Sequence, residues 1–280
     1  MHNNFIFLLL LMAAFCHAGW SSIIKANSNP LGIMGLTCVV ELIIFFPLLF
    51  YVPLPTIEMW GYIIATTILH GFYRLNVLYS YKYGDLSYVY PIARGGSSLI
   101  ITIISIIFLT NKINVYGFIG IMIVCLGLFL ISKNMFFKVN KVSFLLAIST
   151  AILITSYTII DGLGIRRSNN PYTYLFWMLF LNGIPVLLIS SLKKQKGIRK
   201  LNIKLLLWGI LAGVIAIISY GIVVWSMQFI EIAYVSSIRE TSIIFATLFS
   251  FLILDEKRAK NRVFPAVLVV IGISVVYFQL

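Results

Sequence analysis

Long runs of apolar residues dominate this chain, and they limit what it can fold into. A helix needs roughly 20 apolar residues to cross about 30 Å of hydrocarbon. No water is present at that depth to satisfy the backbone, so such runs must be helical. The predicted spans are Phe5–Ile24, Leu31–Val52, Ile57–Tyr81, Leu86–Leu109, Val115–Ile131, Val142–Gly162, Tyr172–Leu192, Ile203–Ser226, Ile232–Leu254 and Val263–Phe278.

Composition places these runs in a bilayer rather than in a water-soluble core. Hydrophobic residues make up 61% of the chain and charged residues only 10%, against about 25% charged in a typical soluble domain. The net charge of +13 does not indicate nucleic acid, because the basic residues sit in short loops between apolar runs. Three cysteines inside apolar runs fit neither a disulfide framework nor a metal site. We therefore expect no metal and no cofactor.

The first apolar run partly resembles a signal peptide, because Phe5–Cys16 is followed by small residues at Ala18 and Gly19. No lysine or arginine precedes it, whereas a secretory signal normally begins with a basic segment. We therefore predict a retained first helix.

Loop charges predict the orientation. Lysine and arginine accumulate on the cytoplasmic side of membrane proteins, and one set of connections is much richer in them than the other. If the rich side is cytoplasmic, both termini are external. The rich set holds Lys25, Lys82 and the clusters at 133–141, 193–204 and 257–262, and the poor set holds Lys112, Arg166 and Arg167.

The chain also contains an internal repeat, because Ser87–Lys112 aligns with Ala233–Lys257. Chance similarity of apolar residues does not explain aligned polar ones. The matched polar pairs are Arg94 with Arg239, Ser97 with Ser242, Thr102 with Thr247, and Ser105 with Ser250. A unit of five spans is odd, so its second copy is inverted in the membrane, an arrangement shared by many secondary transporters. We predict an all-α membrane protein of ten transmembrane helices, built as two inverted five-helix repeats (1–136 and 141–280) around a central cavity.

Charged residues within spans are candidates for a binding site, because an ion at the centre of a span costs at least about 2.5–3.5 kcal/mol. Arg94 and Arg239 fall at matching depths in the two repeats. Either they bind an anionic group, for which a guanidinium is suited, or each neutralises a carboxylate. The candidate carboxylates are Glu41, Asp161 and Glu240.

Other candidates lie on the same predicted helix faces. The third span carries His70, Tyr73 and Arg74, and His70 is a candidate proton carrier because its side chain titrates near neutrality. Structural hydrogen bonding for His70 and a surface-directed side chain for Arg74 are the alternatives. The predicted substrate-binding set is Trp20, Glu41, Tyr73, Arg74, Tyr90, Arg94, Tyr157, Asp161, Arg239 and Glu240.

Sequence motifs of catalysis are lacking: there is no phosphate-binding glycine loop, no HExxH and no Gly-x-Ser-x-Gly. The chain instead resembles the drug/metabolite transporter superfamily, EamA type, over essentially its whole length. The resemblance is carried by the aligned segments above, by Pro91, by the acidic helix end Asp255–Glu256 and by Gly272; Asn111 and Ser236–Ser237 depart from the pattern. It implies secondary active transport through a cavity lined by spans 1, 3, 4, 6, 8 and 9, and not an enzyme.

We expect a small polar metabolite, an amino acid-like zwitterion or an organic anion, carried by alternating access with a proton as the candidate coupling ion. A quaternary amine or polyamine carrier using Trp20, Tyr157 and the carboxylates, and a flippase for a lipid-linked substrate, are the alternatives. A membrane enzyme or scaffold would need clustered chemical groups at one membrane surface. We expect a multi-pass protein of the bacterial inner membrane, a monomer or homodimer surrounded by lipid, with no nucleic-acid partner.

Overall fold

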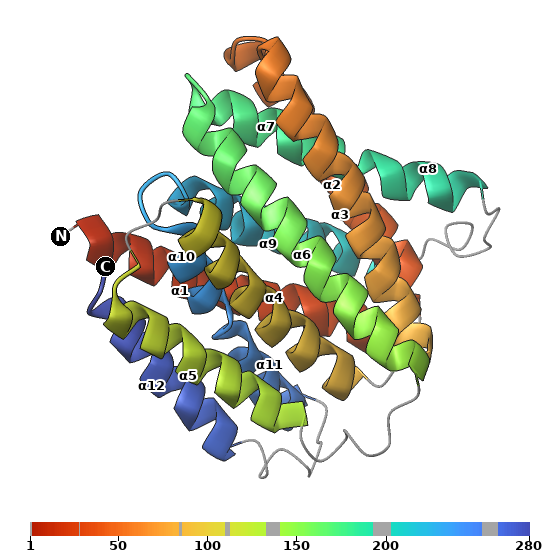
Figure 1. The fold of residues 1–280 in the computed structure, drawn as a ribbon. Helices are drawn as coiled ribbons and strands as arrows, with labels where there is room; N and C mark the ends of the chain where they lie inside the picture. Colours follow the sequence, from red (N-terminus) through yellow and green to blue (C-terminus); the bar gives the residue numbers. More distant parts are fainter. Residues whose placement is uncertain are drawn as a thin grey trace.

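Helices make up the structure of this chain, a computed structural model that describes residues 2–27, 29–83, 86–109, 113–132, 141–192, 203–253 and 263–280 (Figure 1). The basic connections at 133–140, 193–202 and 254–262, with Asp255–Glu256, lie outside the described residues. The helices are α1 (His2–Ala26), α2 (Pro30–Leu48), α3 (Ile57–Tyr83), α4 (Leu86–Phe108), α5 (Val115–Ser132), α6 (Lys141–Arg167), α7 (Pro171–Asn182), α8 (Ile184–Leu192), α9 (Ile203–Ser226), α10 (Ile232–Arg239), α11 (Ser242–Ile253) and α12 (Val263–Tyr277). A short 3₁₀ turn, η1 (Leu49–Tyr51), follows α2.

Ten membrane segments account for these twelve helices, because two segments are each broken into two. The seventh span is α7 plus α8, and the ninth is α10 plus α11. Six of the described helical stretches are long and apolar enough by themselves to cross a membrane. The polar third span is not among them, nor are the fifth, the ninth and the tenth, whose described apolar helices are shorter. The predicted all-α membrane fold is confirmed.

Asparagine–proline pairs begin two of the spans. Asn29 caps α2 by accepting a hydrogen bond from the Gly32 N–H at 2.9 Å, with Pro30 in the first turn. Asn170 caps α7 by accepting one from the Tyr172 N–H at 3.0 Å, with Pro171 following. Proline is tolerated there because first-turn N–H groups have no partner within the helix.

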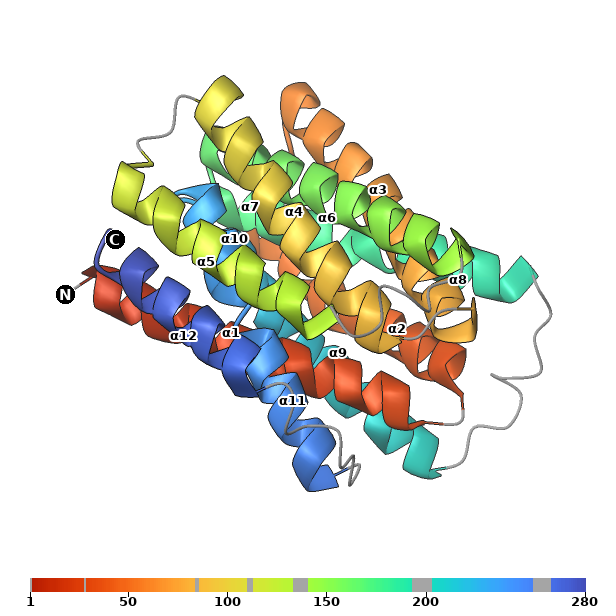
Figure 2. The same cartoon turned by 60° about the horizontal axis from the view of Figure 1, so that its bottom comes forward.

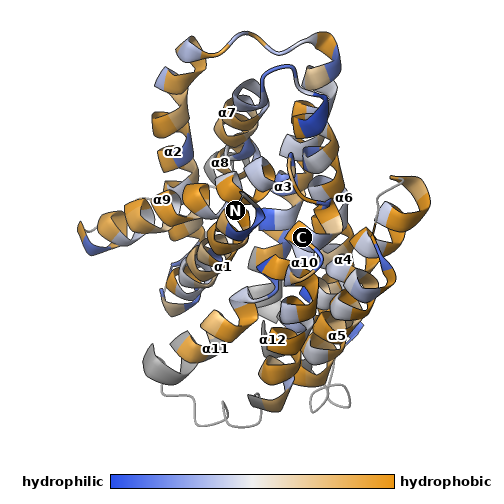
Figure 3. Cartoon of the chain, turned by 90° about the vertical axis from the view of Figure 1, so that its left-hand side faces the viewer, coloured by the Kyte–Doolittle hydropathy of each residue, from blue (hydrophilic) through white to orange (hydrophobic). Residues whose placement is uncertain are grey.

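Helix pairings recur between the two halves, as a duplicated and inverted unit requires. α3 packs on α6 as α9 packs on α1, and α4 packs on α6 as α11 packs on α1. α5 and α12, the last spans of the two halves, lie side by side in Figures 1 and 2. Most residues along the helices are hydrophobic (Figure 3), as expected of helices in a bilayer.

The seam between α5 and α12 is built from glycines. A Cβ added at Gly272 would lie 2.7 Å from the carbonyl oxygen of Gly120, and one added at Gly120 would lie 2.9 Å from that of Gly272. Small residues permit such backbone contact, which favours helix association in a membrane. The two helices therefore meet at a distance that only glycine allows.

The seam makes a testable prediction. Gly272→Ala will lower the free energy of unfolding by about 1–3 kcal/mol, because the new Cβ meets backbone that cannot rotate away. The matched control is Gly61→Ala, where an added Cβ meets no atom within 4 Å. Denaturation by SDS in mixed micelles will measure both variants. Equal stability of the two variants would contradict the claim that the α5–α12 contact requires glycine at position 272.

Candidate functional site

A cavity lies between the two halves and is lined by charged, polar and aromatic side chains. It encloses about 530 Å³ of space, including its opening. Residues of α1, α2 and α3 line it from the first half, and residues of α6, α7, α9 and α10 from the second. The lining residues are His17, Trp20, Glu41, His70, Tyr73, Arg74, Tyr157, Leu179, Asn182, Ala216, Ser219, Tyr220 and Arg239.

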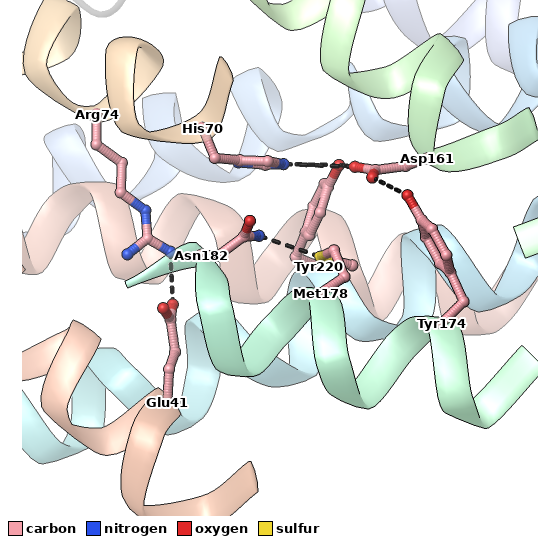
Figure 4. Close-up of polar contacts among 8 residues, drawn as sticks. All are labelled: Glu41, His70, Arg74, Asp161, Tyr174, Met178, Asn182 and Tyr220. Carbon is pink, nitrogen blue, oxygen red and sulfur yellow. Dashed lines mark hydrogen bonds and ion pairs between the residues drawn. The ribbon is translucent and has the colours of Figure 1, made fainter. Parts of the chain in front are cut away.

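Glu41 and Arg74 form one charged wall of the cavity. The Arg74 Nη2 lies 2.6 Å from Glu41 Oε1, and its Nη1 donates to the Cys38 sulfur at 2.8 Å. The second carboxylate oxygen, Glu41 Oε2, is buried without a hydrogen-bond partner. The neighbouring Asn182 donates to the Met178 sulfur at 3.1 Å, and its Oδ1 likewise has no partner (Figure 4). This wall therefore offers two buried acceptors to a ligand.

Arg239 supplies a cation elsewhere on the cavity wall. Its guanidinium carbon lies 5.5 Å from the centroid of the Tyr220 ring, and the side chain is close to the Tyr157 hydroxyl. Among the described residues, no carboxylate lies within 4 Å of it. A guanidinium held mainly by aromatic groups keeps its capacity to bind an anion.

Asp161 lies behind the cavity wall rather than on it, and it is fully buried. Its Oδ1 accepts a hydrogen bond from the Tyr174 hydroxyl at 2.7 Å, and its Oδ2 accepts one from the Tyr220 hydroxyl. His70 Nε2 lies 3.4 Å from Oδ2 (Figure 4). Tyr220 and His70 thus stand between this carboxylate and the cavity.

Arg94 is the counterpart of Arg239 in the repeat, but its environment differs completely. Its Nε donates to Glu240 Oε2 at 3.1 Å. Its Nη2 donates to the Arg239 carbonyl at 3.1 Å and to the Ser242 hydroxyl at 3.3 Å. These acceptors flank the break between α10 and α11, where the helical ladder is interrupted. Arg94 therefore binds the broken helix of the opposite half instead of lining the cavity.

Of the residues singled out from the sequence, seven line the cavity and three are buried behind it. Spans 2 and 7 contribute to the lining, whereas the described residues of α4 do not. The side chain of Tyr90 lies outside the described residues. The seven are Trp20, Glu41, His70, Tyr73, Arg74, Tyr157 and Arg239, and the three are Arg94, Asp161 and Glu240.

Sequence reasoning missed several polar residues of the wall. His17 lies on the same helix face as Trp20, three residues earlier, and its Nε2 and the Trp20 Nε1 are both buried without partners. Asn182 is an isolated amide within an apolar run, which is itself a signal of function in a membrane. Tyr220 occupies the span that the repeat pairs with the third, so extending the alignment would have drawn attention to it.

A multi-pass helical membrane protein with a charged cavity between two repeated halves is a transporter. The EamA-like transporter family model matches residues 4–133 and again 141–278, so the chain belongs to the EamA-like transporter family. Members of this family are transporters and not enzymes. A solved structure described only as the crystal structure of a protein superimposes with a TM-score of 0.73 over 100% of this chain and 98% of the other. At 12% identity it shows the fold alone. The curated proteins include no match.

The Arg94 contacts predict a large effect on stability. Arg94→Gln leaves Glu240 buried without its cation, and breaking a buried pair in this way costs about 3–5 kcal/mol. The double variant Arg94→Gln/Glu240→Gln removes both charges and will be more stable than Arg94→Gln alone. SDS denaturation of Arg94→Gln, Glu240→Gln and the double variant will give the coupling free energy between the two side chains. Additive single effects would show that the pair does not stabilise the fold.

Proposed function

We propose that this protein transports a small amino acid-like zwitterion by alternating access, with the substrate carboxylate on Arg239 and its ammonium near Glu41. One observation carries the proposal: among the described residues, the cavity wall presents a cation without a carboxylate partner, Arg239, together with two unpaired acceptors, Glu41 Oε2 and Asn182 Oδ1. A ligand with one negative and one positive group complements both. The inverted repeat supports alternating access, because two similar halves can exchange conformations around one site.

The repeat explains why Arg239 is available. Arg94 of the first half binds Glu240 of the second. The symmetric arrangement would place a carboxylate of the first half near Arg239, at the position that aligns with Glu240. That position is Gly95. A substrate carboxylate therefore replaces a charge that the second copy of the interaction lacks.

Two other cargoes differ from a zwitterion at one end only. An organic anion would use Arg239 but not the acceptors of Glu41 and Asn182. A quaternary amine or polyamine would use the aromatic rings and carboxylates, but it would face two guanidinium groups, Arg74 and Arg239, that line the same cavity. Like charges at close range oppose such binding, so the zwitterion is favoured over the amine.

Three ligands that share the leucine side chain test the assignment. L-leucine carries both charges, 2-hydroxy-4-methylpentanoate lacks the ammonium and isopentylamine lacks the carboxylate. Thermal stabilisation of purified protein, followed by uptake into proteoliposomes, will rank leucine first, the hydroxy acid second and the amine last. Other amino acids and their hydroxy acids extend the series if the leucine side chain does not fit.

Two variants then test which residues bind the carboxylate and the ammonium of the substrate. Arg239→Gln will weaken binding of both acids by about tenfold to a hundredfold, because a charge-assisted hydrogen bond contributes about 1.5–3 kcal/mol. Asn182→Ala will weaken the zwitterion more than the hydroxy acid, and it disturbs no ion pair. Arg167→Gln, an exposed arginine at the end of α6, is the matched control. Undiminished binding of leucine to Arg239→Gln would contradict the proposal.

A further inference from the structure

The carboxylate of Asp161 is surrounded by hydrogen-bond donors. A carboxylate that is ionised only accepts hydrogen bonds, and Asp161 accepts one at each oxygen from Tyr174 and Tyr220. His70 Nε2 lies 3.4 Å from the same oxygen that Tyr220 contacts. This arrangement matches an ionised Asp161 with a histidine beside it.

The hydrogen bonds assign the tautomer of His70. The Tyr220 hydroxyl has one proton and gives it to Asp161, so toward His70 the Tyr220 oxygen can only accept. His70 Nε2 lies 3.2 Å from this oxygen and 3.4 Å from Asp161 Oδ2, and both are acceptors. The ring hydrogen therefore belongs on Nε2. A further proton would enter at Nδ1 and convert the ring to an imidazolium beside a carboxylate.

The buried charges balance when both histidines of the cavity are neutral. Three arginines and three carboxylates are buried within the described spans, and two pairs are in direct contact: Arg74 with Glu41 and Arg94 with Glu240. The remaining cation and anion do not touch. The Tyr220 ring lies under Arg239, while its hydroxyl binds Asp161. Arg239 and His70 are thus both neighbours of Tyr220.

The positive charge of Arg239 opposes a second positive charge on His70. The two charges lie no more than about 10 Å apart, on either side of the Tyr220 ring. In a medium of effective dielectric near 20, neutralising the cation at that distance changes the protonation equilibrium on the order of tenfold. A carboxylate on Arg239 has this effect. In the proposed binding mode the ammonium of the same substrate lies at Glu41, which pairs with Arg74 (Figure 4).

We propose that His70 and Asp161 form a proton site that fills when the cargo carboxylate binds Arg239, so that a proton accompanies the cargo. The inference rests on the proposed function, because it needs an anionic group on Arg239. The groups in contact with His70 are Asp161 and Tyr157 from α6, Tyr220 from α9 and Tyr73 from its own helix, and the charges of Arg74 and Glu41 act on it. Tyr174 from α7 contacts Asp161, and His17 from α1 and Arg239 from α10 line the same cavity.

The link between Arg239 and His70 can be tested without a ligand. Solid-state NMR of the full chain in proteoliposomes, with ¹⁵N-labelled histidine, reports the tautomer and the imidazolium fraction of each ring. His70→Gln assigns the His70 signal, and His2 serves as an internal reference. At high pH we expect the Nε2–H tautomer. A Nδ1–H tautomer, or an imidazolium throughout the pH range, would overturn the proposal.

At a fixed pH, three variants should change the imidazolium fraction of His70 in a defined direction. Arg239→Gln will raise the imidazolium fraction of His70, by about tenfold in the equilibrium constant, because it removes the opposing cation. Tyr220→Phe will also raise it, because Asp161 loses a competing donor while the ring remains. Asp161→Asn will lower it. Arg167→Gln changes the same charge at an exposed position and will leave His70 unchanged. An unchanged or lowered fraction in folded Arg239→Gln, or in Tyr220→Phe if that variant alone folds, would overturn the proton site.

Adding ligand separates this inference from the proposed function. Saturating 2-hydroxy-4-methylpentanoate will raise the imidazolium fraction of wild-type His70, as Arg239→Gln does. L-leucine will raise it less, because its ammonium offsets the negative charge of Glu41, which favours the imidazolium. If Arg239→Gln has its effect but both acids leave His70 unchanged, the cargo assignment falls and the proton linkage to Arg239 stands. If the acids bind through Arg239 but His70 does not respond, the coupling falls and the transport proposal stands.

Discussion

Charge in hydrocarbon is the constraint on which this structure depends. Each ionised side chain within a span costs at least about 2.5–3.5 kcal/mol, and that cost is offset only when another group compensates the charge. Arg74 and Glu41 join α3 to α2, and Arg94 and Glu240 join α4 to the ninth span. These ion pairs therefore help to decide which helices meet. Arg239 remains the cation compensated mainly by aromatic contacts, and it faces the cavity.

Much of the fold follows from the sequence because its causes are local. Run length fixes the spans, and the Asn–Pro pairs at Pro30 and Pro171 fix where two of them begin. The aligned arginines indicate the duplication. The seventh span, Tyr172–Leu192, is predicted without a break, although Pro185 lacks the N–H that would bond to the Leu181 carbonyl. Only the structure shows that Gly183 approaches Cys38 of α2 so closely that a Cβ would lie 2.9 Å from the Cys38 Cβ.

The site could be predicted only in part, because its partners come from distant segments. Sequence spacing places Glu240 away from the adjacent Arg239, but it says nothing about Arg94 on another helix. No proline in the sequence marks the break between α10 and α11, which follows Arg239. It depends on Arg94, which bonds to the freed carbonyl, and on hydroxyls such as Thr241, which bonds back to the Ile238 carbonyl at 2.8 Å. The aligned residues Arg94 and Arg239 thus lie in different environments, and only tertiary contacts distinguish the two.

The buried charges also bear on the ancestry of the two halves. Within the described spans the first half holds two arginines and one glutamate, and the second holds one arginine and two carboxylates: Arg74, Arg94 and Glu41 against Arg239, Asp161 and Glu240. A homodimer of either half would bury an excess of two like charges in lipid. Each half therefore depends on the other to compensate its own buried charges.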